Sequence, residues 1–436
     1  MKRYFFHFID KLNINGSFFK KKVVKDFLAV LFSNLALRPI QFLKSFVVAK
    51  YLGPSDYGLL KTIELVQMLN KYGSLGFNTT ASREVGNLLG ENDRVKADIV
   101  KNTAYSSEII LSILLFIVGL TSSLFVESKN NVILIVLASF GLLFSKLRGV
   151  LATEAVIQKK FVLTSKITFY TVSIASIVVI IAVPFLKIYA VMMTNILIGV
   201  FAIIFYFRFM SFNYKFKIKK KTFKKILSIS IPLTIGTLAL GSFQYAERIL
   251  IIKYLGMNSL GLYTFAAMIT GQFIVIFKSS IKVRIQDVFE GIGKGNYNRI
   301  HKLVIKETML LVLGSVLLIP AVCVAVEVFI PLFLPKWSGA ILISKIYIFS
   351  LPFEVMLSYI SVVLISSVVD KQRKLPLYRF ISTGILILSV LYLHYFGVLT
   401  LENFVIIRIL SSFFYIIPVV YLYRKHFFLK HIKRVL

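Results

Sequence analysis

The sequence predicts an all-α integral membrane protein with about twelve transmembrane helices in two six-helix bundles related by a pseudo-twofold axis. Three observations predict this fold: an apolar composition, twelve apolar segments of membrane-spanning length, and a ten-residue repeat found once in each half. Of the 436 residues, 57% are hydrophobic and only 16% are charged, whereas soluble domains average about 45–50% apolar and about 25% charged residues. The mean hydropathy of +0.81 agrees with a multi-pass membrane protein.

The apolar segments have the length and pattern of membrane helices. A helix needs roughly 20 apolar residues to cross the bilayer. Segments such as IILSILLFIVGLTSSLFV (109–126) are apolar on every face, whereas a barrel strand would alternate with period two. The predicted spans are about 27–49, 59–80, 105–126, 132–150, 162–183, 188–207, 227–252, 261–281, 309–334, 341–369, 376–396 and 401–423.

The net charge of +33 is distributed over the loops in an alternating pattern. Cytoplasmic loops of membrane proteins carry an excess of Lys and Arg. With a cytoplasmic N-terminus, the seven inner segments carry 38 of the 52 Lys and Arg residues, and the six outer loops carry five. This asymmetry places both termini in the cytoplasm and predicts contact with anionic membrane lipids. The dispersal of charge over seven loops argues against a nucleic-acid partner.

The longest basic loop, NYKFKIKKKTFKK (213–225), separates the sixth span from the seventh. The N-terminus lacks the ordered regions of a signal peptide, so we expect it to be retained. The single cysteine, Cys323, allows no intramolecular disulfide, and the five His residues show no metal-ligand spacing. The predicted organisation is a basic N-terminal segment (1–26), a six-helix bundle (27–210), a basic cytoplasmic linker (211–225), a second six-helix bundle (226–424) and a basic tail (425–436).

A ten-residue segment occurs twice in the chain. KYLGPSDYGL (50–59) and KYLGMNSLGL (253–262) share six residues at a shift of 203, and RVKADIVKNT (94–103) resembles RIHKLVIKET (299–308) at a shift of 205. Both pairs lie in the same order on the same predicted sides of the membrane, which indicates an internal duplication. Because six spans is an even number, the halves should be related by an axis along the membrane normal. Chance similarity of apolar sequence is the alternative.

The segments AKYLGPSDYGLL (49–60) and ASREVG (81–86), together with the 6+6 layout, resemble the polysaccharide-repeat flippases. Their superfamily also contains the MATE drug antiporters and the lipid II flippases. The helix layout of nearly the whole chain resembles that of the family. The resemblance in sequence is confined to residues 30–105 and to the related repeat at 235–308. It implies transport of an undecaprenyl-diphosphate-linked oligosaccharide from the inner to the outer leaflet of the bacterial cytoplasmic membrane, by alternating access. It further implies a role in O-antigen, capsule or other surface polysaccharide synthesis, without a cofactor, beside a polysaccharide polymerase and chain-length machinery. We expect a monomer.

Polar residues inside the spans recur at spacings of three and four, so each set lies on one helix face. Charge at membrane depth is costly and usually faces a cavity. Arg and Lys would bind a diphosphate by charge-assisted hydrogen bonds, and amides would bind sugar hydroxyls. The predicted substrate-binding residues are Arg38, Gln41 and Lys44 in the first span, Gln67 and Lys71 in the second, Gln244 and Arg248 in the seventh, Lys278 in the eighth and Arg408 in the twelfth.

Three carboxylates within the spans, Glu64, Glu247 and Glu354, are candidates for ion coupling. Removal from water favours the protonated form of a carboxyl group, which suits exchange of a coupling proton. The structural alternative for Glu64 is neutralisation of Arg38 or Lys44.

The basic residues of the spans also have structural alternatives. Arg248 can pair with its neighbour Glu247, and Arg408 can pair between helices. A long lysine side chain can extend toward the headgroups. This alternative applies to Lys61, Lys71, Lys278 and Lys282.

Other functions fit parts of the sequence. A MATE-type ion-coupled antiporter of drugs or cations would share the fold, but the first span has no Asp or Glu and the predicted cavity is basic. A lipid II flippase is a close relative that often has additional spans. A membrane-embedded polysaccharide polymerase or ligase would need larger outer loops, and the chain has no Asp-x-Asp motif or nucleophile–His–acid constellation. We therefore expect a transporter and not an enzyme.

Overall fold

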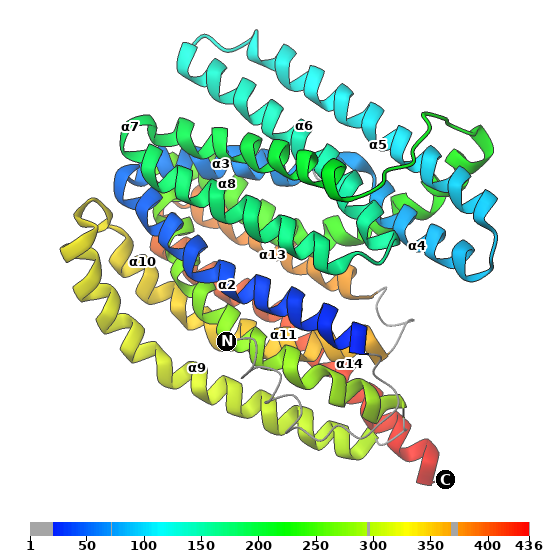
Figure 1. Ribbon diagram of the computed structural model, residues 1–436. Coiled ribbons are helices and arrows are strands. Elements are labelled where there is room, and N and C mark those ends of the chain that lie inside the picture. Colours follow the sequence, from blue (N-terminus) through cyan, green and yellow to red (C-terminus); the bar gives the residue numbers. More distant parts are fainter. Residues whose placement is uncertain (1–20, 71, 294–296, 368–373, 436) are drawn as a thin grey trace, which may run out of the picture.

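The computed structural model describes residues 21–70, 72–293, 297–367 and 374–435. Within these ranges all regular structure is helical (Figure 1). The elements are α2 (Lys21–Tyr51), α3 (Pro54–Asn70), η1 (Tyr72–Ser74), α4 (Phe77–Gly90), α5 (Arg94–Ser123), α6 (Lys129–Ile157), α7 (Phe161–Phe209), α8 (Lys220–Gly293), α9 (Tyr297–Phe333), η2 (Pro335–Trp337), α10 (Ala340–Tyr347), η3 (Ile348–Ser350), α11 (Leu351–Ser367), α13 (Lys374–Tyr395) and α14 (Leu401–Val435).

Eight helical segments of the described chain have the length and apolar composition needed to cross a membrane. They lie in α5, α6, α7, α8, α9, α10–α11, α13 and α14. Two of these helices are interrupted, because Lys187 in α7 and Gly256 in α8 have non-helical backbone angles. The predicted breaks between the fifth and sixth spans and between the seventh and eighth fall at these residues. The total of twelve spans, the side of each terminus and the domain boundaries stay predictions.

Local boundaries differ from the sequence prediction in three places. The predicted second span (59–80) is divided between α3, which ends at Asn70, and α4, which begins at Phe77. The inner loop predicted at 82–104 contains most of α4 and the start of α5. Phe77, Ala81 and Val85 recur every four residues on α4 and are buried against α5, so tertiary packing stabilises this largely polar helix. At the third boundary, α8 begins at Lys220, inside the predicted linker.

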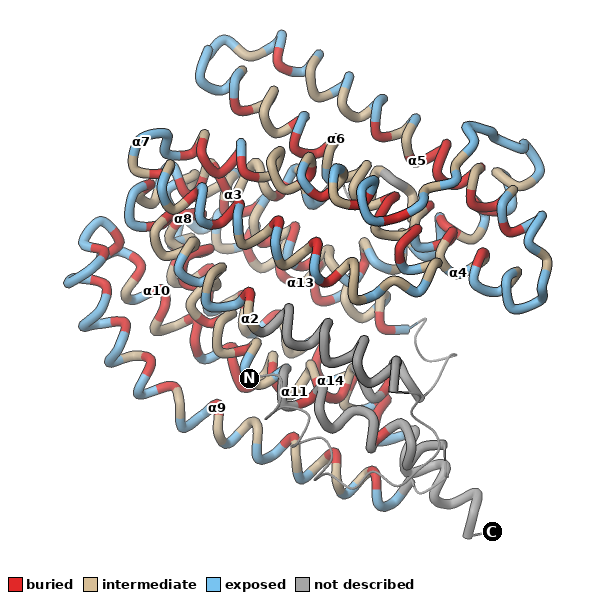
Figure 2. Tube along the Cα trace, viewed as in Figure 1, coloured by how far each residue is buried: buried red, intermediate tan, exposed pale blue. Residues whose placement is uncertain are grey.

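The helices pack as two groups that meet chiefly at α3 and α8. In the first group α2 packs on α7, α7 on α6 and α6 on α5, and in the second group α8 contacts α10, α11 and α13. The largest buried cluster draws on both groups, with Tyr57 and Leu60 of α3, Phe265 of α8, and Trp337. Figure 2 shows buried positions where helices meet and exposed ones along the outward sides of α5 and α9.

One glycine of the repeated segment has a positive φ angle in both copies. Gly53 and Gly256 are equivalent at the shift of 203, and their φ angles are 76° and 82°. This left-handed region favours glycine, which explains why both copies have one. In the first copy the turn joins α2 to α3, and in the second it forms the kink within α8.

A second pair of equivalent glycines lies where α3 touches α8. A methyl group added at Gly58 would stand 1.9 Å from the carbonyl oxygen of Met257, and one added at Gly261 would stand 1.9 Å from the carbonyl oxygen of Pro54. Pro54 and Met257 are themselves equivalent at the shift of 203. The same contact is therefore made twice with the roles of the two helices exchanged, and we call it the reciprocal glycine contact.

Candidate functional site

A cluster of charged side chains lies where α3 faces α8, close to the reciprocal glycine contact. Lys61 and Glu64 of α3 form an ion pair of 2.7 Å, and their side chains are 20% and 33% exposed. The Lys61 ammonium group also lies 4.9 Å from the centre of the Tyr57 ring. Lys44 of α2 is half-buried and within electrostatic range of both Glu64 and Lys61. Glu64 is thus neutralised mainly by Lys61, which lies one helical turn away.

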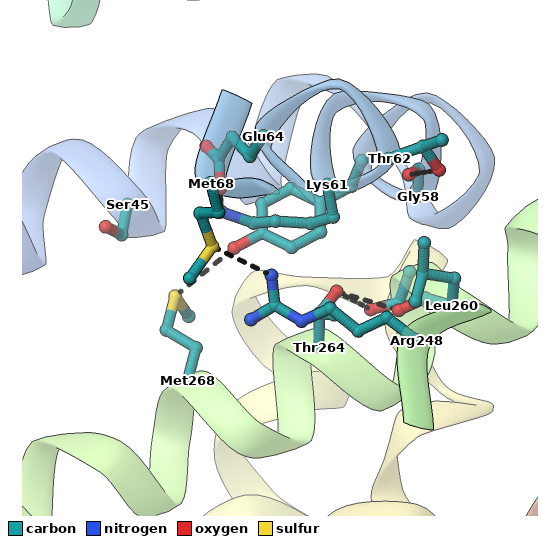
Figure 3. Close-up of polar contacts among 12 residues, drawn as sticks. Ser45, Gly58, Lys61, Thr62, Glu64, Met68, Arg248, Leu260, Thr264 and Met268 are labelled. Atoms are coloured by element: carbon teal, nitrogen blue, oxygen red, sulfur yellow. Dashed lines mark hydrogen bonds and ion pairs between the residues drawn. The ribbon is translucent and has the colours of Figure 1, made fainter. Parts of the chain in front are cut away.

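Arg248 reaches this cluster from α8. Its Nη1 donates to the Sδ atom of Met68 on α3 at 3.6 Å, and it forms no ion pair with any residue that the structure describes. Figure 3 shows the Arg248 side chain pointing from α8 toward Met68, with Lys61 and Glu64 on the facing helix. A thioether is a weak acceptor and a guanidinium has five N–H donors. Most of the hydrogen-bonding capacity of Arg248 is therefore open to an anionic ligand.

Trp337 lies at the predicted outer end of this site, and we call its contacts with Ala49, Tyr57 and Phe265 the outer closure. Its indole N–H donates to the carbonyl oxygen of Ala49 at 2.9 Å, and its ring stacks on Phe265 with centroids 4.3 Å apart. The Tyr57 ring meets it edge-on at 5.3 Å, and Trp337 is fully buried. Because Tyr57 contacts both Trp337 and Lys61, it connects the outer closure to the charged cluster.

Hydroxyl groups join the two helix groups further from the predicted outer end. Tyr245 of α8 donates to the hydroxyl of Tyr72 at 2.9 Å, and the two rings meet edge-on. The hydroxyls of Thr80 on α4 and Ser230 on α8 are 2.7 Å apart and buried. These contacts and the Trp337 closure flank the charged cluster along α8.

A second charged cluster lies among α8, α11 and α14. Arg408 is buried, and it donates from Nε to Glu247 at 3.3 Å and from Nη2 to Glu354 at 2.8 Å. Its guanidinium also lies 4.6 Å from the centre of the Tyr347 ring. Arg408 therefore has the interhelical pairing given as its structural alternative, and Glu247 pairs with it and not with the adjacent Arg248. The predicted substrate role of Arg408 and ion-coupling roles of the two glutamates stay predictions.

The remaining predicted residues have fewer contacts. The Gln67 amide donates to a backbone carbonyl of α6 at 3.4 Å, and Gln41 is half-buried on α2. Lys71 lies outside the described residues. Three further residues are exposed and form no hydrogen bond or ion pair within the described chain: Arg38, Gln244 and Lys278.

The sequence did not predict the roles of Lys61, Tyr57 and Trp337 in the structure. The suggestion that Lys61 extends to the headgroups is wrong, because its side chain is largely buried against Glu64. The spacing i, i+3 was the available signal for this pair. Tyr57 and Trp337 gave no signal, because their contact joins segments far apart in the chain. No cluster of metal-binding residues occurs in the part of the chain that the structure describes.

A protein-family model described as "Polysaccharide biosynthesis protein" matches residues 23–284, more than half of the chain. No curated protein matches the chain by sequence. Solved structures match over most of both chains, at 14–16% identity.

An inward-facing multidrug resistance MATE family transporter of the MOP superfamily has 15% identity and a TM-score of 0.66, with 90% of this chain and 95% of that chain covered. The lipid II flippase MurJ, in an inward closed conformation, has 16% identity and a TM-score of 0.64, with 91% and 87% covered. A MOP superfamily transporter from Pyrococcus furiosus Vc1 has 14% identity and a TM-score of 0.58, with 93% and 96% covered. These matches confirm the predicted multi-pass α-helical fold.

Proposed function

The chain belongs to the polysaccharide biosynthesis protein family, and we propose that it flips undecaprenyl-diphosphate-linked oligosaccharides from the inner to the outer leaflet of the bacterial cytoplasmic membrane. Family membership supports a role in polysaccharide synthesis, and the transporter fold supports movement of the substrate over a change in its bonds. One protein with this fold is a lipid II flippase, so the fold accommodates a lipid substrate there.

The observation that carries the proposal is the charge balance of the cluster formed by α2, α3 and α8. Lys44, Lys61 and Arg248 contribute three positive charges, and Glu64 contributes one negative charge. Arg248 has only a thioether as its hydrogen-bond acceptor among the described residues. A diphosphate supplies charged oxygen acceptors, which bind a guanidinium more strongly than a sulfur atom does.

The outer closure supports the transport cycle that we propose. In the conformation described here the reciprocal glycine contact and Trp337 hold α3 against α8 at the predicted outer end. The headgroup would bind to Arg248 and Lys61 from the inner side while the polyprenyl tail stays in lipid. Separation of α3 from α8 would then expose the headgroup outside, and Tyr57 would transmit the change between the two sites.

Translocation by purified protein in liposomes tests the proposal, with a fluorescently labelled lipid-linked oligosaccharide as substrate. A hydrogen bond to a charged group contributes about 1.5–3 kcal/mol, so Arg248→Gln should reduce the rate about 10- to 100-fold at limiting substrate. Lys253→Gln is a matched control, because Lys253 is an exposed cation on the same helix outside the cluster. Wild-type rates for Arg248→Gln would remove this residue from the site. A lengthened or transferred glycan would instead indicate a polymerase or ligase.

The second cluster disfavours the alternative of a drug or cation antiporter. Such a substrate needs an accessible carboxylate, and both Glu247 and Glu354 already form ion pairs with Arg408. Glu64 is likewise paired with Lys61. Uptake of a cationic dye by the same liposomes, without movement of the lipid-linked oligosaccharide, would favour the antiporter.

A further inference from the structure

The connection between α7 and α8, residues 210–219, is a non-helical segment fixed on α5, and we call it the strap. On the right of Figure 1 it is the green trace that leaves α7 and passes beside α5. Three alternate backbone N–H groups of the strap donate to polar side chains of α5: Lys215 to Asn102 at 3.2 Å, Lys217 to Ser106 at 3.1 Å and Lys219 to Thr103 at 3.4 Å. Alternation of this kind is typical of an extended chain.

Aromatic packing and further hydrogen bonds fix the start of the strap. The rings of Phe212 and Tyr214 lie against Tyr105 of α5, with centroids 6.2 and 6.4 Å away. The Tyr214 hydroxyl lies 2.9 Å from the Ser106 hydroxyl, and the Gln158 amide donates to a strap carbonyl at 3.0 Å. The strap is therefore held by the protein itself before any ligand binds.

This anchoring leaves a basic and apolar surface exposed. The side chains of Lys215, Lys217 and Lys219 are exposed, and none of them pairs with a carboxylate of the described chain. In an extended chain alternate residues are about 7 Å apart, so the three ammonium groups form a short row. Phe216 and Ile218 alternate with these lysines along the chain and project to the other side of the strap, and they are 65% and 41% exposed.

The position of the strap identifies the partner that fits this surface. It follows directly from α7, a membrane-capable helix whose last residue, Phe209, is 60% exposed. The strap therefore follows the predicted inner end of the sixth span, next to the expected hydrocarbon region. The membrane interface offers both an apolar layer for Phe216 and negative charge for the lysines, whereas an acidic soluble protein offers only the charge.

We propose that the strap is a binding site for anionic phospholipid headgroups. Lys215, Lys217 and Lys219 contact the headgroup phosphates, and Phe216 enters the interfacial layer. The hydrogen bonds to α5 hold the lysines in a row, so that little chain entropy is lost when the lipid binds. The site is separate from the Arg248 cluster and does not depend on the identity of the transported substrate.

Titration of the detergent-solubilised full-length protein tests this site. The probes are dioctanoyl-phosphatidylglycerol and dioctanoyl-phosphatidylcholine, and the readout is amide hydrogen exchange of residues 211–219 measured by mass spectrometry. Each lysine near an anionic surface contributes a factor of about five to binding, so we expect phosphatidylglycerol to protect the strap at least tenfold more tightly than phosphatidylcholine.

Three variants make the test specific. K215Q/K217Q/K219Q should lose at least tenfold in phosphatidylglycerol affinity, whereas K159Q/K160Q/K166Q, which removes the same charge at the α6–α7 connection, should change less than twofold. N102A/S106A keeps every lysine but removes the acceptors of the Lys215 and Lys217 amides and the hydroxyl that contacts Tyr214, and it should also bind more weakly. Emission of the single tryptophan, buried in the folded protein, checks that each variant folds.

Three results would overturn the proposal. One is equal protection by the two lipids in the wild-type protein. Another is an equal loss of affinity in the two lysine variants, which would leave only general electrostatic attraction. The third is strap protection by an acidic peptide but not by phosphatidylglycerol, which would assign the surface to a protein partner.

Discussion

Replacing Gly58 by Ala should force open the contact between α3 and α8. The added methyl would stand 1.9 Å from the carbonyl oxygen of Met257 and 2.8 Å from its carbonyl carbon, whereas carbon contacts are favourable at about 3.5–4.0 Å. Because both neighbouring atoms belong to the backbone, no change of rotamer relieves the overlap. The helices must separate by about 1.5 Å, as the difference between these distances requires.

The energetic consequence of this overlap is large. Overpacking costs about 1–3 kcal/mol, and a backbone contact lies at the upper end of that range. A cost of about 3 kcal/mol changes the ratio of closed to open molecules about 150-fold. Gly261→Ala should have a similar effect, because its added methyl would stand 1.9 Å from the carbonyl oxygen of Pro54.

The assay uses the single tryptophan of the chain, Trp337, which is buried between the two helix groups. In wild-type protein its emission should be blue-shifted and resistant to acrylamide. In Gly58→Ala the indole loses the carbonyl of Ala49 as hydrogen-bond partner and gains water, so the emission should shift to the red and quenching should increase. Gly86→Ala is the control, because nothing lies within 4 Å of its added methyl. Emission and quenching in Gly58→Ala that match the wild-type protein would refute the role assigned to this contact.

Charged residues elsewhere give three further tests. Arg408→Gln leaves the buried Glu247 without its cation and should lower the free energy of unfolding by about 3–5 kcal/mol. Adding Glu247→Gln to this variant should restore most of the loss. Thermal unfolding in detergent measures the single and the double variant, and wild-type stability of the single variant would contradict the pairing. Transport by Glu64→Gln in liposomes, measured with and without a pH gradient, tests whether this carboxylate takes part in ion coupling or only pairs with Lys61; a response to the gradient equal to that of the wild-type protein would exclude Glu64 as the coupling group. Asp93 caps α5 by accepting from the Lys96 amide at 3.0 Å, so Asp93→Ala should speed hydrogen exchange in the first turn several-fold, while Asp93→Asn, which keeps an oxygen acceptor but loses the ion pair with Lys96, should speed it less. A hydrogen bond from the Lys96 side chain lowers the pKa of Asp93, so the stabilisation of α5 by this carboxylate is present at neutral pH and is lost as the pH falls through that lowered pKa. If protection of the first turn, corrected for the intrinsic pH dependence of exchange, stays constant as the pH is lowered, this role of Asp93 is contradicted.

Local features of the fold could be predicted from the sequence because they depend on nearby residues. The two KYLG segments each supply a glycine, and Gly53 and Gly256 have the positive φ angles that glycine adopts readily. Helix α4 was not predicted, because its composition is largely polar. The helix is stabilised by three buried residues that pack on α5, and this packing cannot be read from the sequence. The contact of Gly58 with the backbone near Gly261 was equally hidden, since it depends on how α3 approaches α8.

The charged clusters were predicted in part for the same reason. Because a charged side chain within the membrane is costly, the sequence alone identified Arg248 and Arg408 as functional candidates. Their partners depend on packing: Arg408 binds carboxylates from two other helices, whereas Arg248 faces a thioether. Spacing alone could have paired Lys61 with Glu64, but no spacing rule connects Tyr57 with Trp337.

The reciprocal glycine contact has the symmetry of an isologous dimer interface, in which one surface patch meets a second copy of itself. Two identical subunits joined in this way would have to keep Tyr57 and its equivalent, Leu260, the same. Within a single polypeptide the two positions are free to diverge, and they have done so. Tyr57 alone carries the hydroxyl that reaches Met268 and the ring that meets Trp337, so the two sides of the reciprocal glycine contact have different chemistry.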